Sequence, residues 1–268
     1  MSDLKGIRVW NANDHDCKAI NLVTDPVSSI DGLLASIEAA RQNMWPRDDL
    51  PFELVYRGQD SGMPLVPRQI IGCHKNLHEK LQKMLSVCRD AVGADYTDHQ
   101  IYFMMRHAGL PSHLLDWSWQ WEVALWFAIH DADGRLKNRS SSLWALRPLL
   151  RDLQGGVVNG SHIDPVFFRA DQLTCERSRK QDGCAYQVHF EKSGDEIIPM
   201  PMNNDSIYSE RLLEIPLCAS MSCADVESWL LRDRPELADL LDGEHPLPSS
   251  VVEGCIKLFN KENWYDYT

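Results

Sequence analysis

Residues 106–128 read RHAGLPSHLLDWSWQWEVALWFA, and the interpretation of the rest of the chain starts from this stretch. A short polar segment lies here between two stretches of large apolar side chains. Burying polar groups among apolar ones costs free energy unless they find hydrogen-bond partners. In this segment the candidate side chains for a polar site are His107, His113, Asp116, Trp117 and Ser118.

The part of this stretch around Asp116 and Ser118 has two compatible interpretations. As a structural element it is a loop in which one of these side chains caps the helix that follows, because Asp and Ser accept hydrogen bonds from the N–H groups at a helix start. As a functional element the same loop presents such N–H groups to a bound phosphate. Both interpretations stay open.

A second candidate is Tyr56-Arg57-Gly58-Gln59, which ends a strand predicted over residues 52–57. The guanidinium of an arginine offers a planar fork of donors that suits an anion, and a following glycine lets a ligand approach the backbone. The alternative is an arginine that pairs with a core carboxylate beside a turn. The residues alone do not decide between these two interpretations.

Other polar motifs carry less information. The charged run 177–182 is either a second phosphate-contacting edge or a solvated turn. His74 and His78 have the spacing of zinc ligands on a helix, but HExxH and an evident third ligand are absent, so we predict no metal site. The common nucleotide-triphosphate, dinucleotide and serine-hydrolase motifs are absent as well.

The composition excludes several classes of protein. The chain has 268 residues and a formal net charge of -12, and such a negative field repels phosphate backbones, so nucleic acid is not an expected partner. The longest apolar run, Val123 to Ile129, is too short to span a bilayer, and the N-terminus lacks the features of a signal peptide. The eight cysteines are scattered, so we expect a cytoplasmic protein with reduced thiols and no membrane partner.

Hydrophobic periodicity and turn residues predict the elements of the fold. The predicted helices start at Ser28 or Ser29, span 76–92, 98–107, 122–130 and 222–231, and start again at Pro235. The predicted strands span 5–10, 20–23, 52–57, 142–146, 186–190 and 212–217, with a mobile loop at 155–160. Because strands and helices mix without a regular βαβ rhythm, we predict an α+β fold with a mixed, mainly antiparallel sheet flanked by helices.

Together these segments resemble the FRG domain, a family of mainly bacterial and phage-linked proteins. The family takes its name from a Phe/Tyr-Arg-Gly motif, matched by Tyr56-Arg57-Gly58, and then shows a segment matched by Pro64-Leu65-Val66-Pro67. Its longest motif, approximately QHYGLPTRLLDWT before a helix of the form NPLVALYFA, is matched by most of residues 107–128. Four positions depart from the family pattern: Arg106, Ser112, His113 and Ser118. The arginine missing at position 113 implies an altered ligand or a weaker affinity if that arginine contacts the ligand in the family.

The resemblance extends over roughly residues 55–190, and it suggests three segments. They are an N-terminal strand and helix segment at 1–50 packed on the core, an FRG domain at 51–220 and a helical C-terminal extension at 221–268.

The order of the elements also resembles that of ADP-ribosyltransferases, which implies NAD as a ligand. In that analogy Arg57 holds the NAD phosphates, Ser118 supports the site and Gln181 takes the place of a catalytic glutamate. A glutamine cannot act as a base or present a negative charge to an oxocarbenium-like centre, so Asp116 is the candidate for the missing carboxylate. Asp116 and Gln181 are therefore the predicted catalytic residues.

Two classes of function stay open. The first is an enzyme that transfers ADP-ribose or cleaves NAD. The second is a non-catalytic module that senses a nucleotide or binds a partner protein, in phage defence or a toxin system. In both classes the predicted ligand-binding residues are Tyr56, Arg57, Gly58, Gln59, His107, His113, Trp117 and Ser118.

Overall fold

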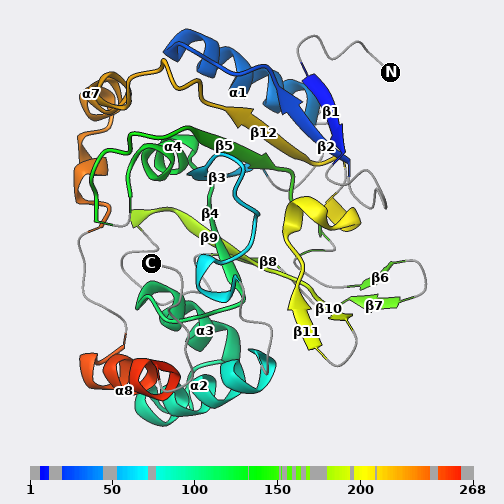
Figure 1. Ribbon diagram of the computed structural model, residues 1–268, viewed down its shortest axis with the longest axis vertical. Helices are drawn as coiled ribbons and strands as arrows, with labels where there is room; N and C mark the ends of the chain where they lie inside the picture. Colours follow the sequence, from blue (N-terminus) through cyan, green and yellow to red (C-terminus); the bar gives the residue numbers. More distant parts are fainter. Residues whose placement is uncertain are drawn as a thin grey trace.

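The chain folds into one central sheet with helices on both faces (Figure 1). The structure is a computed structural model, and it describes residues 7–11, 20–44, 53–71, 77–131, 133–150, 152, 156–158, 161–163, 167–169, 180–193, 196–208, 210–241 and 247–260. Within these ranges there are six α-helices, so the predicted α+β class is confirmed. In the same ranges no helix is both long and apolar enough to cross a membrane.

The sheet has eight strands and is mixed and mainly antiparallel, as predicted. Its order is β1 (Ile7–Asn11), β2 (Ile20–Thr24), β12 (Leu212–Pro216), β5 (Ser141–Leu146), β3 (Val55–Asp60), β4 (Leu114–Ser118), β9 (Gly183–Gln187) and β8 (Phe167–Arg169). Only the β12–β2 pair is parallel among the described strand pairs of this sheet. The strand predicted at 186–190 is β9, which begins earlier, at Gly183, and ends at Gln187. Gly183 is part of the strand because it pairs with Ser118 on β4.

Two short hairpins lie beside the sheet. One pairs β10 (Phe190–Ser193) with β11 (Glu196–Pro199). The other pairs β6 (Gly156–Val158) with β7 (Ser161–Ile163), so part of the predicted loop at 155–160 is a strand; residues 155, 159 and 160 lie outside the described residues. Strands of three residues are too short for an apolar period to reveal them.

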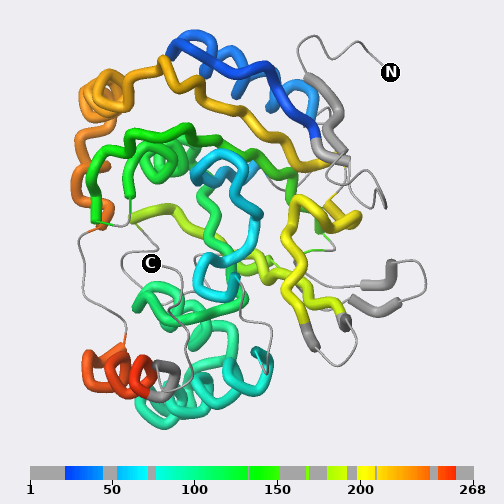
Figure 2. Tube along the Cα trace, viewed as in Figure 1, coloured from blue at the N-terminus to red at the C-terminus, as the bar shows by residue number. Residues whose placement is uncertain are grey.

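The helices divide into two layers. One sheet face, here called the α4 face, is covered by α1 (Ile30–Met44), α4 (Trp121–Ile129) and α7 (Cys223–Asp233). The other, here called the α3 face, is covered by α2 (Leu77–Val92), α3 (Asp98–His107) and α8 (Ser249–Asn260). Figures 1 and 2 show α1 and α7 in the upper part of the view, α4 beside β5, and α2, α3 and α8 at the bottom. Each layer packs its own core of buried apolar side chains.

Local signals account for the helices well. Thr97 and Gln100 form a reciprocal capping box at the start of α3, and the Ser222 hydroxyl accepts a hydrogen bond from the Asp225 amide at the start of α7. Both arrangements satisfy N–H groups that a helix start leaves without acceptors. The predicted bounds of α2, α3, α4 and α7 are therefore confirmed to within one or two residues.

The segment before α4 differs from its prediction. Leu114 to Ser118 is strand β4, paired along its whole length with β9, and not a loop. The cap residue of α4 is Gln120, whose side chain makes no capping hydrogen bond, so neither Asp116 nor Ser118 caps this helix. The strand is buried along most of its length, and a central strand covered on both faces does not show the alternation by which strands are recognised.

Candidate functional site

The strands β3 and β4 diverge in the middle of the sheet. They share one residue pair, Tyr56 with Ser118, whereas β3 pairs with β5 over its full length and β4 does so with β9. Beyond that pair no further pairing of β3 with β4 is described. Arg57 follows Tyr56 at this point of divergence.

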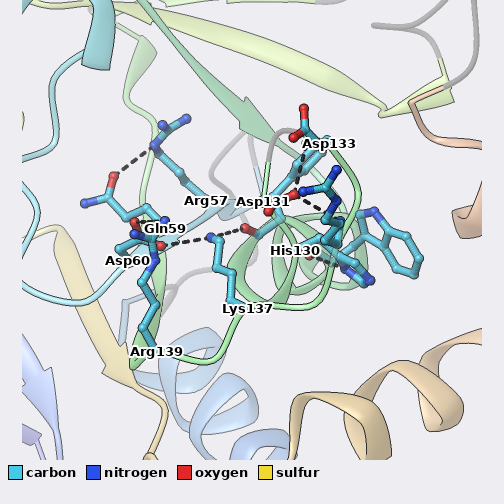
Figure 3. A network of polar contacts seen from close by, with 11 residues as sticks. Arg57, Gln59, Asp60, His130, Asp131, Asp133, Lys137 and Arg139 are labelled. Carbon is cyan, nitrogen blue, oxygen red and sulfur yellow. Dashed lines mark hydrogen bonds and ion pairs between the residues drawn. The ribbon is translucent and has the colours of Figure 1, made fainter. Parts of the chain in front are cut away.

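Arg57 bridges the two diverging strands. Its Nη1 donates a hydrogen bond to the backbone oxygen of Asp116 on β4, at 2.6 Å. Its Nε donates to Oε1 of Gln59, at 3.3 Å, and Figure 3 shows this second bond. Burial lowers the pKa of Arg57 to about 10. The positive charge of Arg106 also lowers this pKa, whereas the negative charge of Asp116 raises it. The guanidinium therefore stays protonated at neutral pH.

The carboxylate of Asp116 pairs with a second arginine. Arg106, in the last turn of α3, donates from Nε to Oδ2 of Asp116 at 2.8 Å and from Nη1 to Oε1 of Gln69 at 2.7 Å. Burial would raise the pKa of Asp116, but the charges of Arg106, His107 and Arg57 and the Arg106 hydrogen bond outweigh it and lower the pKa. The other oxygen, Oδ1, is buried and has no hydrogen-bond partner among the described residues.

We refer to Arg57, Gln59, Gln69, Arg106 and Asp116 as the Arg57–Asp116 cluster. It holds two guanidinium groups and one carboxylate, so its formal charge is positive although the whole chain is acidic. His107 lies alongside, since its charge also lowers the pKa of Asp116, and its ring packs on Phe103 at 4.3 Å. The arrangement can hold an anion and can also accept a hydrogen bond at Oδ1.

Arg106 and Gln69 are members of the cluster that the sequence interpretation missed. Arg106 begins the polar stretch and departs from the family pattern, but it was not predicted as a site residue, and it lies ten residues before the carboxylate that it binds. The turn at Gly109, which has a φ of 78°, ends α3 and returns the chain toward β4. A left-handed φ at a glycine just after a helix is a signal for such a reversal, but it does not reveal which side chains meet.

Gly58 has a packing role that its predicted role does not include. A Cβ at this position would lie 1.9 Å from the backbone oxygen of Ala124 and 2.4 Å from the backbone nitrogen of Ala128, both in α4. The glycine therefore lets α4 lie directly on β3. Tyr56 is buried on the same face, with a side chain that is 1% exposed, so neither residue reaches the Arg57–Asp116 cluster.

Ser118 and Gln181 form hydrogen bonds within the fold. The Ser118 hydroxyl donates to the backbone oxygen of Gln181 at 2.7 Å and accepts from the Gln120 amide at 3.0 Å. The Gln181 side chain is buried and donates to the backbone oxygen of Leu240 at 3.3 Å. The structure thus joins Ser118 and Gln181 to each other, but not to Asp116 through any described hydrogen bond.

His113 and Trp117 belong to the core on the α3 face. The ring of His113 lies 4.1 Å from that of Tyr102, and burial, together with His99 and His78, lowers the pKa of His113 to about 3. Trp117 is 3% exposed and packs on Tyr186. The predicted site residues that the structure does bring together are therefore Arg57, Gln59 and Asp116, with His107 alongside.

A metal centre finds no support in the part of the chain that the structure describes. No group of three or more His, Cys, Asp or Glu side chains lies close enough there to hold an ion. His74, and Arg177 and Arg179 of the charged run, lie outside the described residues.

The comparisons with known proteins support the family interpretation. A family model described as FRG domain matches residues 53–136, a range that contains β3, α2, α3, β4 and α4. No curated protein and no solved structure gives a significant match. The matched range includes every residue of the Arg57–Asp116 cluster, whereas the likeness to ADP-ribosyltransferases stays a prediction.

Proposed function

Because the chain contains an FRG domain at residues 53–136, we propose that this domain binds a phosphorylated nucleotide at the Arg57–Asp116 cluster. The buried and unpartnered Oδ1 of Asp116, held between two arginines, is the observation that carries the proposal.

The two arginines supply the phosphate-binding groups. In each of them Nε and Nη1 make the hydrogen bonds described above, and Nη2 has no described acceptor. Guanidinium groups bind phosphate oxygens with good geometry and strong charge-assisted hydrogen bonds. One carboxylate does not neutralise both cations, which favours a ligand that carries negative charge.

Asp116 supplies the group that distinguishes a nucleotide from a simple anion. Leaving a buried acceptor without a donor costs on the order of 1–3 kcal/mol. A ribose hydroxyl donates to such an oxygen, so a ligand that combines phosphate with ribose satisfies both halves of the cluster. ADP-ribose and NAD have this combination of groups.

Non-catalytic recognition is the function that this geometry supports best. The cluster contains one carboxylate, and the amide of Gln181, the other predicted catalytic group, is engaged by Leu240. NAD cleavage or ADP-ribosyl transfer is the second candidate. It is favoured by the position of Asp116 in the cluster, because an ionised carboxylate stabilises a developing oxocarbenium ion.

Calorimetric titration with ADP-ribose and with NAD tests the binding proposal. We expect saturable binding that weakens at least tenfold in Arg57→Gln, since a charge-assisted hydrogen bond contributes about 1.5–3 kcal/mol. Arg89→Gln is the matched control, because it removes an arginine that pairs with Asp98 on the surface, and it should leave affinity unchanged. Absence of binding in the unmodified chain would refute the proposal.

Release of nicotinamide separates the two candidates. A chain that binds NAD without releasing nicotinamide acts as a sensor. Release that Asp116→Asn abolishes, with binding retained, identifies the enzyme. Following the family resemblance, we place either activity in phage defence or a toxin system, and plaque counts on cells that express the unmodified chain or Arg57→Gln test that context.

A further inference from the structure

A pocket lies beside the C-terminal end of α4 and is lined in part by Ile129, the last residue of that helix. Its volume is about 190 Å³, and its lining includes Lys137, Ser141, Leu217, Cys223 and Val226. At about 30 Å³ for each water molecule, the volume corresponds to roughly six waters, which is enough for a phosphate group with a small substituent.

Ser141 places an unused hydroxyl in the wall of this pocket. Its side chain is 3% exposed, and its Oγ has no hydrogen-bond partner among the described residues. Leu143 and Ala145, two and four positions further along β5, belong to the core on the α4 face, as does Val226 of the pocket wall. Since alternate residues of a strand point to the same side, the Ser141 side chain lies on the side of β5 that carries the pocket.

Lys137 brings a positive charge to the same pocket. Its Nζ lies 3.0 Å from Oδ1 of Asp60 and donates to the backbone oxygen of Phe127 at 2.9 Å, as Figure 3 shows. An ammonium group has three protons, so one remains for a ligand. Arg139 lies 2.7 Å from the other oxygen of Asp60, which leaves two cations beside one anion.

The start of α7 completes the set of donors. Ser222 already satisfies the Asp225 amide with its hydroxyl and the Val226 amide with its backbone oxygen. The amides of Cys223 and Ala224 belong to the first turn, where an α-helix has no internal acceptor for them. The first turn of a helix also carries partial positive charge, which favours a bound anion.

We infer that this pocket binds a phosphate group, either as inorganic phosphate or as a small phosphate monoester. The hydroxyl of Ser141, the ammonium group of Lys137 and the first-turn amides of α7 provide its donors. The inference does not rest on the nucleotide proposed for the Arg57–Asp116 cluster, although the charge of Arg57 contributes to the lowered pKa of Lys137. The pocket adds a second anion-binding position outside the residues that match the FRG domain, since Lys137, Ser141 and Cys223 all follow residue 136.

Calorimetric titration of the full chain with inorganic phosphate, and separately with glycerol phosphate, tests the inference. We expect saturable binding of at least one of the two, weakened about tenfold or more by Ser141→Ala. This variant should fold normally, because the hydroxyl that it removes has no described partner within the protein.

Ser142→Ala is the matched control. It removes the neighbouring serine hydroxyl, which is also buried but bonds to Glu214 and Ser61 instead, and phosphate affinity should not change. Arg57→Gln separates this pocket from the Arg57–Asp116 cluster. The inference is overturned if neither ligand binds, if Ser141→Ala binds as tightly as the unmodified chain, or if Arg57→Gln alone abolishes binding.

Discussion

Replacing His113 with phenylalanine should remove a large part of the pH dependence of the free energy of unfolding. The ring is 7% exposed and lies among Tyr102 and Phe190, so phenylalanine preserves its aromatic contacts. Burial and the charges of His99 and His78 lower its pKa to about 3 in the folded chain. The ring therefore remains neutral in the fold at any pH near neutrality.

The sign and size of the effect follow from this lowered pKa. An unfolded chain has a histidine pKa of about 6.5, so between pH 6.5 and pH 3 the unfolded state binds a proton that the folded state does not. Stability therefore falls as the pH falls through this window. At pH 5 the difference is about 1.5 pKa units, which corresponds to a loss of about 2 kcal/mol relative to pH 7.5.

Urea unfolding followed by tryptophan fluorescence between pH 7.5 and pH 5 measures this loss. The decline of the unfolding free energy should be about 2 kcal/mol smaller in His113→Phe than in the unmodified chain. Leu115→Val is the control, because it removes a buried methylene at a cost of about 1 kcal/mol but keeps the histidine, so its curve should be lower and parallel. Parallel curves for His113→Phe and the unmodified chain would refute the reasoning.

Two further substitutions test the packing of the fold. Gly58→Ala should lower the free energy of unfolding by about 3 kcal/mol or more in urea, because its Cβ collides with the Ala124 backbone, whereas Gly254→Ala meets no atom within 4 Å and should not destabilise. Arg211→Met should cost about 3–5 kcal/mol, seen as a lower melting temperature, because it leaves the buried carboxylate of Asp152 without its ion pair; an unchanged melting temperature would contradict this.

The three residues of the Tyr56-Arg57-Gly58 motif have three different tasks. Tyr56 fills the core on the α4 face, Arg57 bridges the diverging strands and Gly58 allows the close approach of α4. Consecutive residues of a strand point to opposite faces, so one short motif serves both layers of the fold. A substitution at Tyr56 or Gly58 therefore tests folding, whereas one at Arg57 changes both the bridge between the strands and the site.

The sequence by itself determined the features that depend on neighbours along the chain. The capping box at Thr97 and the apolar stripe of α2 act over one or two helical turns, so α2 and α3 were predicted nearly to the residue. Helix α8 (Ser249–Asn260) was not predicted as a separate element. Arg57 and Asp116 could be selected as site residues for a similar reason, because an arginine before a glycine and a carboxylate among apolar groups are unusual in their local context.

Only the tertiary structure decided which of the selected residues meet. The pairing of Arg106 with Asp116, the turn of Gln181 toward Leu240 and the contact of Gly58 with α4 each join segments whose relative position depends on the whole sheet. Strand β4 was missed because its burial on both faces removes the alternating pattern that marks a strand. Whether a polar side chain of the selected stretches lies in the core or in the site therefore depends on long-range packing, and local sequence patterns do not encode this packing.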